Sequence, residues 1–126
     1  MSDATFKTAT FKIERLKKRP DFLACAAASA CARGSVLVQM RARDELPLVR
    51  AGFTATKRIG GSVERNRAKR RLREAARLLL PELASPGFDY VFIARGGVTT
   101  RPWARLLDDM KSALIRLAAD RDRPAT

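Results

Sequence analysis

The side chains best equipped for chemistry are basic, and they are concentrated in one stretch of the chain. Between Lys57 and Arg77 there are nine lysine and arginine residues against two glutamates, a net charge of +7 within 21 residues. The whole chain of 126 residues carries a net charge of +13. Basic groups at this density bind phosphate oxygens through charge-assisted hydrogen bonds. The sequence therefore predicts a polyanionic partner, with nucleic acid favoured over a membrane surface.

The sequence offers little for catalysis by protein side chains. It contains no histidine, which excludes the commonest general base, the serine–histidine triad and histidine metal sites. Cys25 and Cys31 do not have the spacing of a zinc pair, and we interpret them as reduced, buried thiols. Asp108 and Asp109 are adjacent carboxylates that we interpret as solvated groups on a helix. We therefore predict no catalytic residue and no metal site in the protein.

An amphipathic helix is expected to carry the basic groups. Ser62 is a suitable N-cap after two glycines, and Pro81 is expected to end the helix near Leu80. One apolar stripe repeats at helical spacing. Its members are Ala68, Leu72, Ala75, Ala76 and Leu79.

The other faces of this helix carry like charges one turn apart. Arg67 with Arg71 and Lys69 with Arg73 are examples, and each i,i+4 pair costs roughly 0.2–0.5 kcal/mol. A bound polyanion would remove that cost, and the helix N-terminus after Gly60 and Gly61 is suited to a phosphate. These features favour a helix that binds a polyanion over an ordinary solvated basic helix.

Length and composition fit a single domain over residues 1–126, with 46% apolar residues available for one core. Residues 1–14 and 119–126 are expected to be flexible. Residues 12–19 contain five basic side chains, and we interpret them as a basic arm, with a solvated tail as the alternative. No apolar run approaches the about 20 residues of a membrane span, and no signal peptide is convincing. The cytoplasm is therefore the expected location.

The hydrophobic patterns predict an α+β fold with a small sheet. Strands are expected over residues 35–43, 48–57 and 88–95, the last of them interior because it is apolar on both faces. A short helix is expected from Pro20 to about Ser29. A final helix, capped by Thr99 or Thr100, is expected to turn Trp103 and a stripe of leucines towards the sheet. On general grounds the strand–helix–strand passage around the basic helix is expected to be right-handed.

The run GFTATKRIGGSVERNRAKRRLREAAR, residues 52–77, closely resembles the signature of the bacterial ribonuclease P protein subunit. That signature has a glycine-containing strand ending in Lys57, a glycine loop, and the RNR motif, here Arg65-Asn66-Arg67. The resemblance extends to RLKKRPDF before the first helix and to FDYVFIAR in the second half, and covers roughly residues 15–118. RNR alone is a weak signal, but with these flanks and spacings it is specific.

The resemblance implies an α-β-β-β-α-β-α order with an extra short strand near residues 31–33 and a left-handed βαβ crossover. It implies maturation of the tRNA 5′ end, with catalytic groups in a partner RNA that uses Mg²⁺. The implied partners are this catalytic RNA and precursor tRNA, with no obligatory protein partner. The main alternative is a structural RNA-binding protein of the ribosome. A nuclease acting without RNA is a weaker alternative, because histidine is absent.

The resemblance also assigns two sets of binding residues. The expected contacts to the catalytic RNA are Lys57, Arg58, Arg65, Asn66, Arg67, Lys69, Arg70 and Arg73. A cleft between the first helix and an open sheet face is expected to hold the single-stranded 5′ leader of the precursor through Lys17, Phe22, Val38, Thr54 and Thr56. Ala26 and Val38 stand where the family commonly has aromatic residues. Less base stacking is therefore expected here, and charge is expected to contribute more to binding of the leader.

Overall fold

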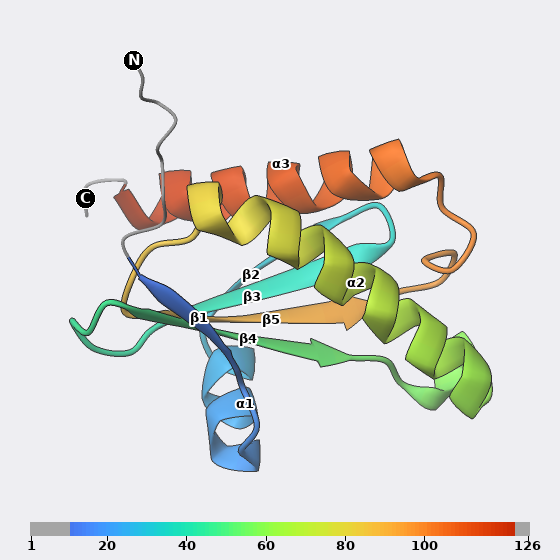
Figure 1. The fold of residues 1–126 in the computed structure, drawn as a ribbon, viewed down its shortest axis with the longest axis horizontal. Coiled ribbons are helices and arrows are strands. Elements are labelled where there is room, and N and C mark those ends of the chain that lie inside the picture. The colour runs from blue at the N-terminus through green and yellow to red at the C-terminus, as the bar shows by residue number, and fades with distance from the viewer. Residues whose placement is uncertain (1–10, 123–126) are drawn as a thin grey trace.

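The computed structural model describes residues 11–122, which form five strands and three α-helices (Figure 1). Residues 12–14 lie in a strand and residues 119–122 in a helix, where the sequence predicted flexible ends. Phe11, also expected to be flexible, is partly buried and packs against the core, and the rest of the two ends lies outside the described residues.

The strands form one mixed sheet in the order β1-β4-β5-β3-β2. Their bounds are β1 Lys12–Arg15, β2 Ser29–Arg33, β3 Val36–Ala42, β4 Leu48–Thr54 and β5 Phe88–Ala94. Strands β1, β4 and β5 are parallel to one another, whereas β3 runs antiparallel to both β5 and β2. The predicted α+β class is confirmed, and β2 includes the short strand that the family resemblance placed near residues 31–33.

Strand β1 was not expected, because its sequence, Lys12 to Arg15, was interpreted as a basic arm. The structure shows that interpretation to be wrong for these four residues, which pair in register with Leu48 to Ala51. The edge of β4 offers unpaired backbone groups that a short extended segment satisfies. Local sequence does not reveal this, since all four side chains of β1 are exposed.

The helices divide between the two faces of the sheet. Helices α2 (Ser62–Leu83) and α3 (Trp103–Asp122) lie together on one face, and α1 (Arg19–Ala26) lies on the other (Figure 1). A short 3-10 helix, η2 (Lys57–Ile59), joins β4 to α2. Helix α1 ends three residues earlier than expected, because Ser29 already belongs to β2.

The passage from β4 through α2 to β5 links two adjacent parallel strands. In Figure 1 both strands point the same way and α2 crosses in front of them, which makes the crossover left-handed. The general expectation of a right-handed crossover is therefore wrong, and the family resemblance gave the correct hand. Most βαβ units are right-handed because of strand twist, so this connection is an exception.

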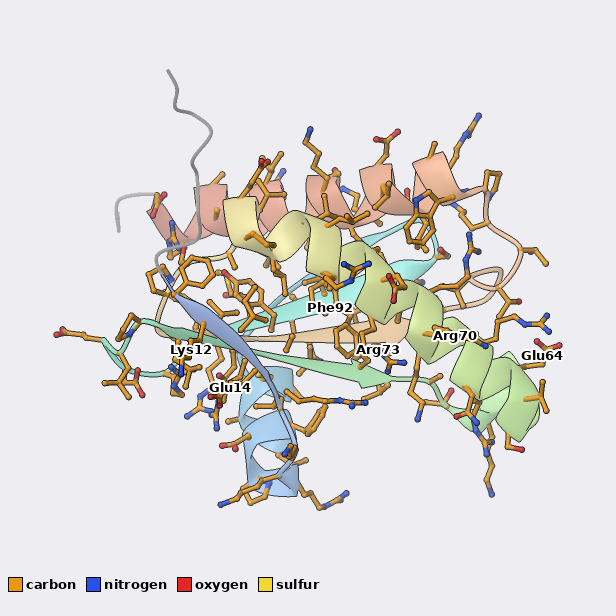
Figure 2. All side chains as sticks on the ribbon, in the orientation of Figure 1. Lys12, Glu14, Glu64, Arg70, Arg73 and Phe92 are labelled. Atoms are coloured by element: carbon orange, nitrogen blue, oxygen red, sulfur yellow. The ribbon has the colours of Figure 1, made fainter. Side chains whose placement is uncertain are left out.

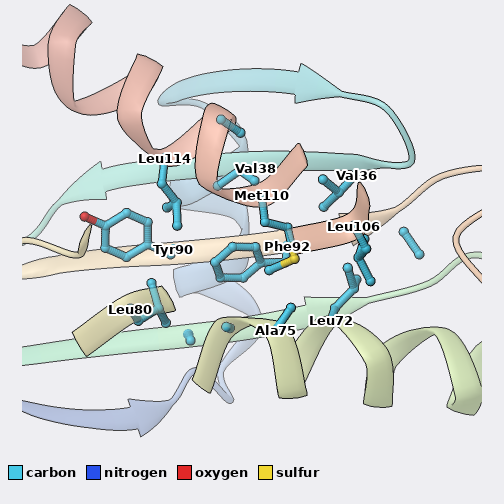
Figure 3. Close-up of a cluster of buried hydrophobic side chains, with 14 of the residues drawn as sticks. Val36, Val38, Leu72, Ala75, Leu80, Tyr90, Phe92, Leu106, Met110 and Leu114 are labelled. Carbon is cyan, nitrogen blue, oxygen red and sulfur yellow. The ribbon is translucent and has the colours of Figure 1, made fainter. Parts of the chain in front are cut away.

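The main core lies between the sheet and helices α2 and α3 (Figure 3). Phe92 of β5 is fully buried and stacks on Phe53 of β4, with ring centroids 5.5 Å apart. The stripe predicted for α2 is buried, apart from Leu79, which is partly buried. Trp103 was expected in this core, but it is 38% exposed at the start of α3.

Both predicted boundaries of α2 shift in the structure. Gly61, not Ser62, occupies the N-cap, and no side chain caps the helix. The helix continues through Pro81 to Leu83, because proline removes one hydrogen bond without preventing a last turn that packs on the core. Helix α3 likewise begins at Trp103, with Pro102 accepting the backbone bond from Leu106, so the predicted threonine cap is wrong.

Candidate nucleic-acid interface

The basic side chains of α2 flank its buried stripe on two sides. Successive residues of an α-helix are rotated by 100° about its axis. The side of α2 towards β4 therefore carries Asn66, Lys69, Arg70, Arg73 and Arg77. Arg71 lies towards α3. Figure 2 shows Arg70 and Arg73 on the β4 side of α2. The predicted RNA-binding residues of α2 are thus not equivalent: most of them form one cationic flank, which we call the β4 flank.

Several cations of α2 have no carboxylate partner within the described part of the chain. The ion pairs of α2 there join Arg67 to Glu64 at 3.7 Å and Arg77 to Glu74 at 2.7 Å, and both are exposed. None of the ion pairs between residues 11 and 122 involves the remaining predicted contacts on α2, which are Arg65, Lys69, Arg70 and Arg73. Cations that form no ion pair are available to bind phosphate.

The segment before α2 adds to the cationic surface. Lys57 and Arg58 are exposed in η2, whose first turn is capped by the Thr56 hydroxyl accepting from the Arg58 backbone N–H at 3.4 Å. Arg65 donates to the Gly60 carbonyl at 3.4 Å and so ties the start of α2 to this segment. Six of the eight predicted contacts therefore lie within the helix itself and two immediately precede it.

Arg71 has a structural role that sequence reasoning missed. Its guanidinium donates to the carbonyls of Val98 and Arg101, at 2.6 and 2.7 Å, and lies 5.7 Å from the centre of the Trp103 ring. These contacts hold the β5–α3 loop against α2. The pairing of an arginine with an exposed tryptophan 32 residues later carries no local signal in the sequence.

We expect Arg71→Ala to lower the free energy of unfolding by about 2 kcal/mol, because two charged hydrogen bonds to backbone carbonyls are lost. Arg70→Ala removes the same charge from an exposed position one residue earlier and serves as the matched control. Urea unfolding of both variants measures the difference. Equal midpoints would mean that the Arg71 contacts contribute nothing to the fold.

The second predicted surface is the sheet face on the α1 side. Phe22 of α1 packs directly over Gly52 of β4, where an added Cβ would lie 2.6 Å from the ring. Leu16, Cys25 and Val91 complete a small cluster beneath it. Gly52 is thus required for the close approach of α1, and the Phe22 ring remains partly exposed beside the open part of the sheet.

The remaining residues predicted to hold a leader are only partly brought together. Thr54 is two positions from Gly52 and so shares its face of the sheet, beside Ile93 in the register of β4 and β5. Lys17 is exposed between β1 and α1. Val38 is fully buried in the core beneath α3, so its predicted place on an open face is wrong. It belongs to the inward set of β3 because side chains alternate along a strand.

A groove joins the two surfaces at the carboxyl ends of β4 and β5. It has a volume of about 740 Å³ and is lined by Thr56, Lys57, Arg58, Ile59, Ile93, Ala94, Arg95 and Gly96. Three of these side chains are cationic and exposed. Arg95 was not among the predicted contacts, although it directly follows β5 in the sequence.

An arginine cluster around a buried carboxylate fixes α1 to the sheet. Asp89 of β5 is fully buried and accepts hydrogen bonds from Arg41, Arg43 and Arg50 at 2.7–3.2 Å. Asp21 of α1 lies 3.2 Å from Arg50 in the same cluster. Burial alone would raise the pKa of Asp89, but the hydrogen bonds from the arginines outweigh it and hold that pKa below its ordinary value. These arginines are engaged within the protein.

Asp109 and Cys25 are both engaged within the described part of the protein. Asp109, predicted to be solvated, is paired with Arg101 at 2.9 Å and is only 12% exposed. Cys25 is buried, and burial raises the pKa of its thiol to about 11, so it stays protonated at neutral pH. Between residues 11 and 122 no group of three or more metal-binding side chains is assembled. None of the helices described is both long and apolar enough to cross a bilayer.

The protein has a small α+β fold, a cationic flank on α2 and no histidine. These features define an RNA-binding protein without a histidine-based active site. Comparison with known proteins gives the family. The chain matches the family model described as Ribonuclease P over residues 11–118 and belongs to that family. It is thus a component of a tRNA-processing endoribonuclease and acts in tRNA 5′ processing as a cofactor of the RNA subunit.

Curated relatives agree with this assignment. The ribonuclease P protein component of Caulobacter vibrioides (strain NA1000 / CB15N) is 70% identical over 118 residues, which cover 93% of this chain and 79% of that protein. That of Ruegeria pomeroyi is 50% identical over 122 residues, covering 94% and 98%.

Two solved structures of the family share the fold. The Staphylococcus aureus RNase P protein, solved at 2.0 Å, is 23% identical with a TM-score of 0.68, covering 82% of this chain and 94% of that one. The Thermotoga maritima protein is 24% identical with a TM-score of 0.68, covering 81% and 96%.

Proposed function

We propose that this protein binds the catalytic RNA of ribonuclease P through η2 and the β4 flank of α2. The observation that carries the proposal is the set of cations there, of which Lys69, Arg70 and Arg73 have no carboxylate partner within residues 11–122. The expected contacts are those predicted from the family resemblance: Lys57 and Arg58 in η2, Asn66, Lys69, Arg70 and Arg73 on the β4 flank, and Arg65 and Arg67 elsewhere on the first turns of α2. RNA phosphates would neutralise like charges that otherwise repel along the helix.

The 5′ leader of precursor tRNA is proposed to cross the sheet face beside α1. Phe22 would contact a leader base, Thr54 and Thr56 would line the path, and Lys17 would approach the backbone. The groove at the carboxyl ends of β4 and β5 would continue this path through Arg95. Val38 is not part of it, because it is buried beneath α3.

Cleavage of the phosphodiester bond is proposed to belong to the RNA subunit with Mg²⁺. The Mg²⁺ is proposed to be held mainly by RNA phosphates and water, since Mg²⁺ sites at phosphate-transfer centres use few protein ligands. The protein would instead neutralise phosphates and lower the Mg²⁺ concentration that the RNA needs. No protein partner is required by this scheme, and its site of action would be the cytoplasm.

The deciding experiment is cleavage of a precursor tRNA at low Mg²⁺ by a bacterial ribonuclease P RNA, with and without this protein. The expected result is correct 5′ cleavage only when both are present. Binding to the RNA without stimulated cleavage would favour the alternative, a structural RNA-binding protein of the ribosomal type. Cleavage by rigorously purified protein alone would contradict the assignment of catalysis to the RNA.

Phe22→Ala is expected to weaken binding of leader-bearing precursor by about 1–3 kcal/mol while leaving mature tRNA affinity unchanged, because stacking on one leader base is lost. Affinities of both RNAs for the reconstituted enzyme measure this. Leu23→Ala, an exposed neighbour on α1, is the control. Equal losses for the two RNAs would show that Phe22 acts only by packing over Gly52.

A further inference from the structure

A second pocket lies on the opposite face of the sheet from the proposed leader path, between β1 and α2. It has a volume of about 320 Å³. Its lining comes from β1, β4 and the second half of α2, in residues Ile13, Glu14, Arg15, Ala51, Phe53, Arg73, Ala76, Arg77, Leu80 and Pro81. The pocket exists because β1 pairs only as far as Ala51, which leaves the edge of β4 beyond it uncovered.

The floor of the pocket is apolar. Ala51, Ala76 and Leu80 are at most 3% exposed, and the Phe53 ring is fixed by stacking on Phe92. On the β1 side the pocket is bounded by Ile13, which is 40% exposed. A flat aromatic floor with aliphatic sides suits a planar, apolar-faced group.

The lining, in contrast, is cationic. It carries three arginines against one carboxylate, that of Glu14. Within residues 11–122 no ion pair engages Arg15 or Arg73, whereas Arg77 uses one nitrogen to bind Glu74. Guanidinium groups both stack on aromatic rings and bind phosphate in a fork, so this lining suits a planar ring with an attached anion.

We propose that this pocket binds a single unstacked nucleotide of the RNA partner, with its base on Phe53 and its phosphate at Arg73 and Arg77. The inference rests on the proposed RNA-binding function and adds a base-binding site to it. Lys69, Arg73 and Arg77 follow one another at single-turn intervals on the same flank of α2, spanning about 12 Å. A strand bound along that flank would therefore be led to the pocket. Its volume lies at the lower end of small-molecule sites, about 300–1,000 Å³, which excludes a duplex.

The test is titration of the ¹⁵N-labelled full chain with adenosine 5′-monophosphate, followed by amide chemical shifts. We expect saturable shifts at Ile13, Phe53 and Ala76. Arg73→Ala should weaken binding about ten-fold, because a charged hydrogen bond is lost. Ile13→Glu, which adds a negative charge beside the pocket, should also weaken it. Arg105→Ala removes an exposed charge of α3 outside the pocket and should change nothing.

Parallel titrations with adenosine and with inorganic phosphate separate the two halves of the ligand. Adenosine alone and phosphate alone are each expected to cause smaller amide chemical-shift changes, at the same residues. The proposal is overturned if phosphate alone reproduces the nucleotide shifts, or if neither Arg73→Ala nor Ile13→Glu weakens binding. It is also overturned if the shifts arise instead from self-association of the chain, detected by sedimentation.

The proposal can fail separately from the function on which it rests. Nucleotide binding in a protein that does not support precursor cleavage would overturn the proposed function and leave the pocket in place. Supported cleavage with no nucleotide binding would overturn the pocket alone.

Discussion

Asp89→Ala is expected to destabilise the protein by about 3–5 kcal/mol, a larger loss than that expected for Arg71→Ala. The variant would leave three arginines facing a fully buried position without its carboxylate. Removing one partner of a buried ionic network leaves uncompensated charge, which costs more than the pair itself contributes. Because small domains have only about 5–15 kcal/mol of stability, urea unfolding should show a large fall in midpoint.

Asp44→Ala is the matched control for this effect. Asp44 also pairs with Arg43, but its own carboxylate is 39% exposed, so its loss should shift the urea midpoint much less than the loss of Asp89. Asp89→Asn, which keeps the size of the side chain and removes its charge, should fall close to the alanine variant. If asparagine restored full stability, packing and not charge would account for the role of Asp89.

The same carboxylate gives the stability a dependence on pH. Its pKa in the folded protein lies below the ordinary value of 3.8, so the carboxylate stabilises the fold above that value. This contribution is lost as the pH falls below about 4 and through the folded pKa, where the proton binds. Thermal unfolding between about pH 7 and pH 3 should show the loss, and Asp89→Asn should show a shallower decline. Parallel declines in the two proteins would assign the acid sensitivity to other carboxylates.

The triple variant of Arg67, Lys69 and Arg70 to alanine is expected to weaken binding to the ribonuclease P RNA by at least about a hundred-fold at low salt. Each lost phosphate contact should also flatten the slope of log affinity against log salt by up to about 0.7–0.9. Filter binding or fluorescence anisotropy across several salt concentrations measures both quantities. The fold should be retained, because these side chains lie outside the buried stripe of α2.

The control for the triple variant removes the same charge from α3. Arg105, Lys111 and Arg116 are exposed on that helix. Alanine at these three positions changes the net charge equally and tests whether overall charge alone drives binding. If both triple variants lost affinity and slope to the same extent, these three basic residues of α2 would have no special role.

The sequence alone determined the nature of the protein and most of its elements. The density of positive charge, the absence of histidine and the RNR motif with its flanks were sufficient to identify an RNA-binding member of the ribonuclease P family. The apolar stripe of α2 and the alternation in β3 and β4 were readable because local periodicity reports which face is buried. That same alternation placed Val38 with the buried set, against its assignment to an open face.

Only the tertiary structure decided which basic residues are free and which are engaged. Arg70 and Arg71 are adjacent and chemically identical, yet the second is bound to the β5–α3 loop. Arg50 is bound to Asp89, 39 residues away, and the exposed residues of β1 join the sheet through backbone bonds. Such pairings depend on groups that are distant in sequence and on backbone atoms that every residue shares. Local composition therefore indicates the class of ligand, whereas the fold determines which side chains remain available to meet it.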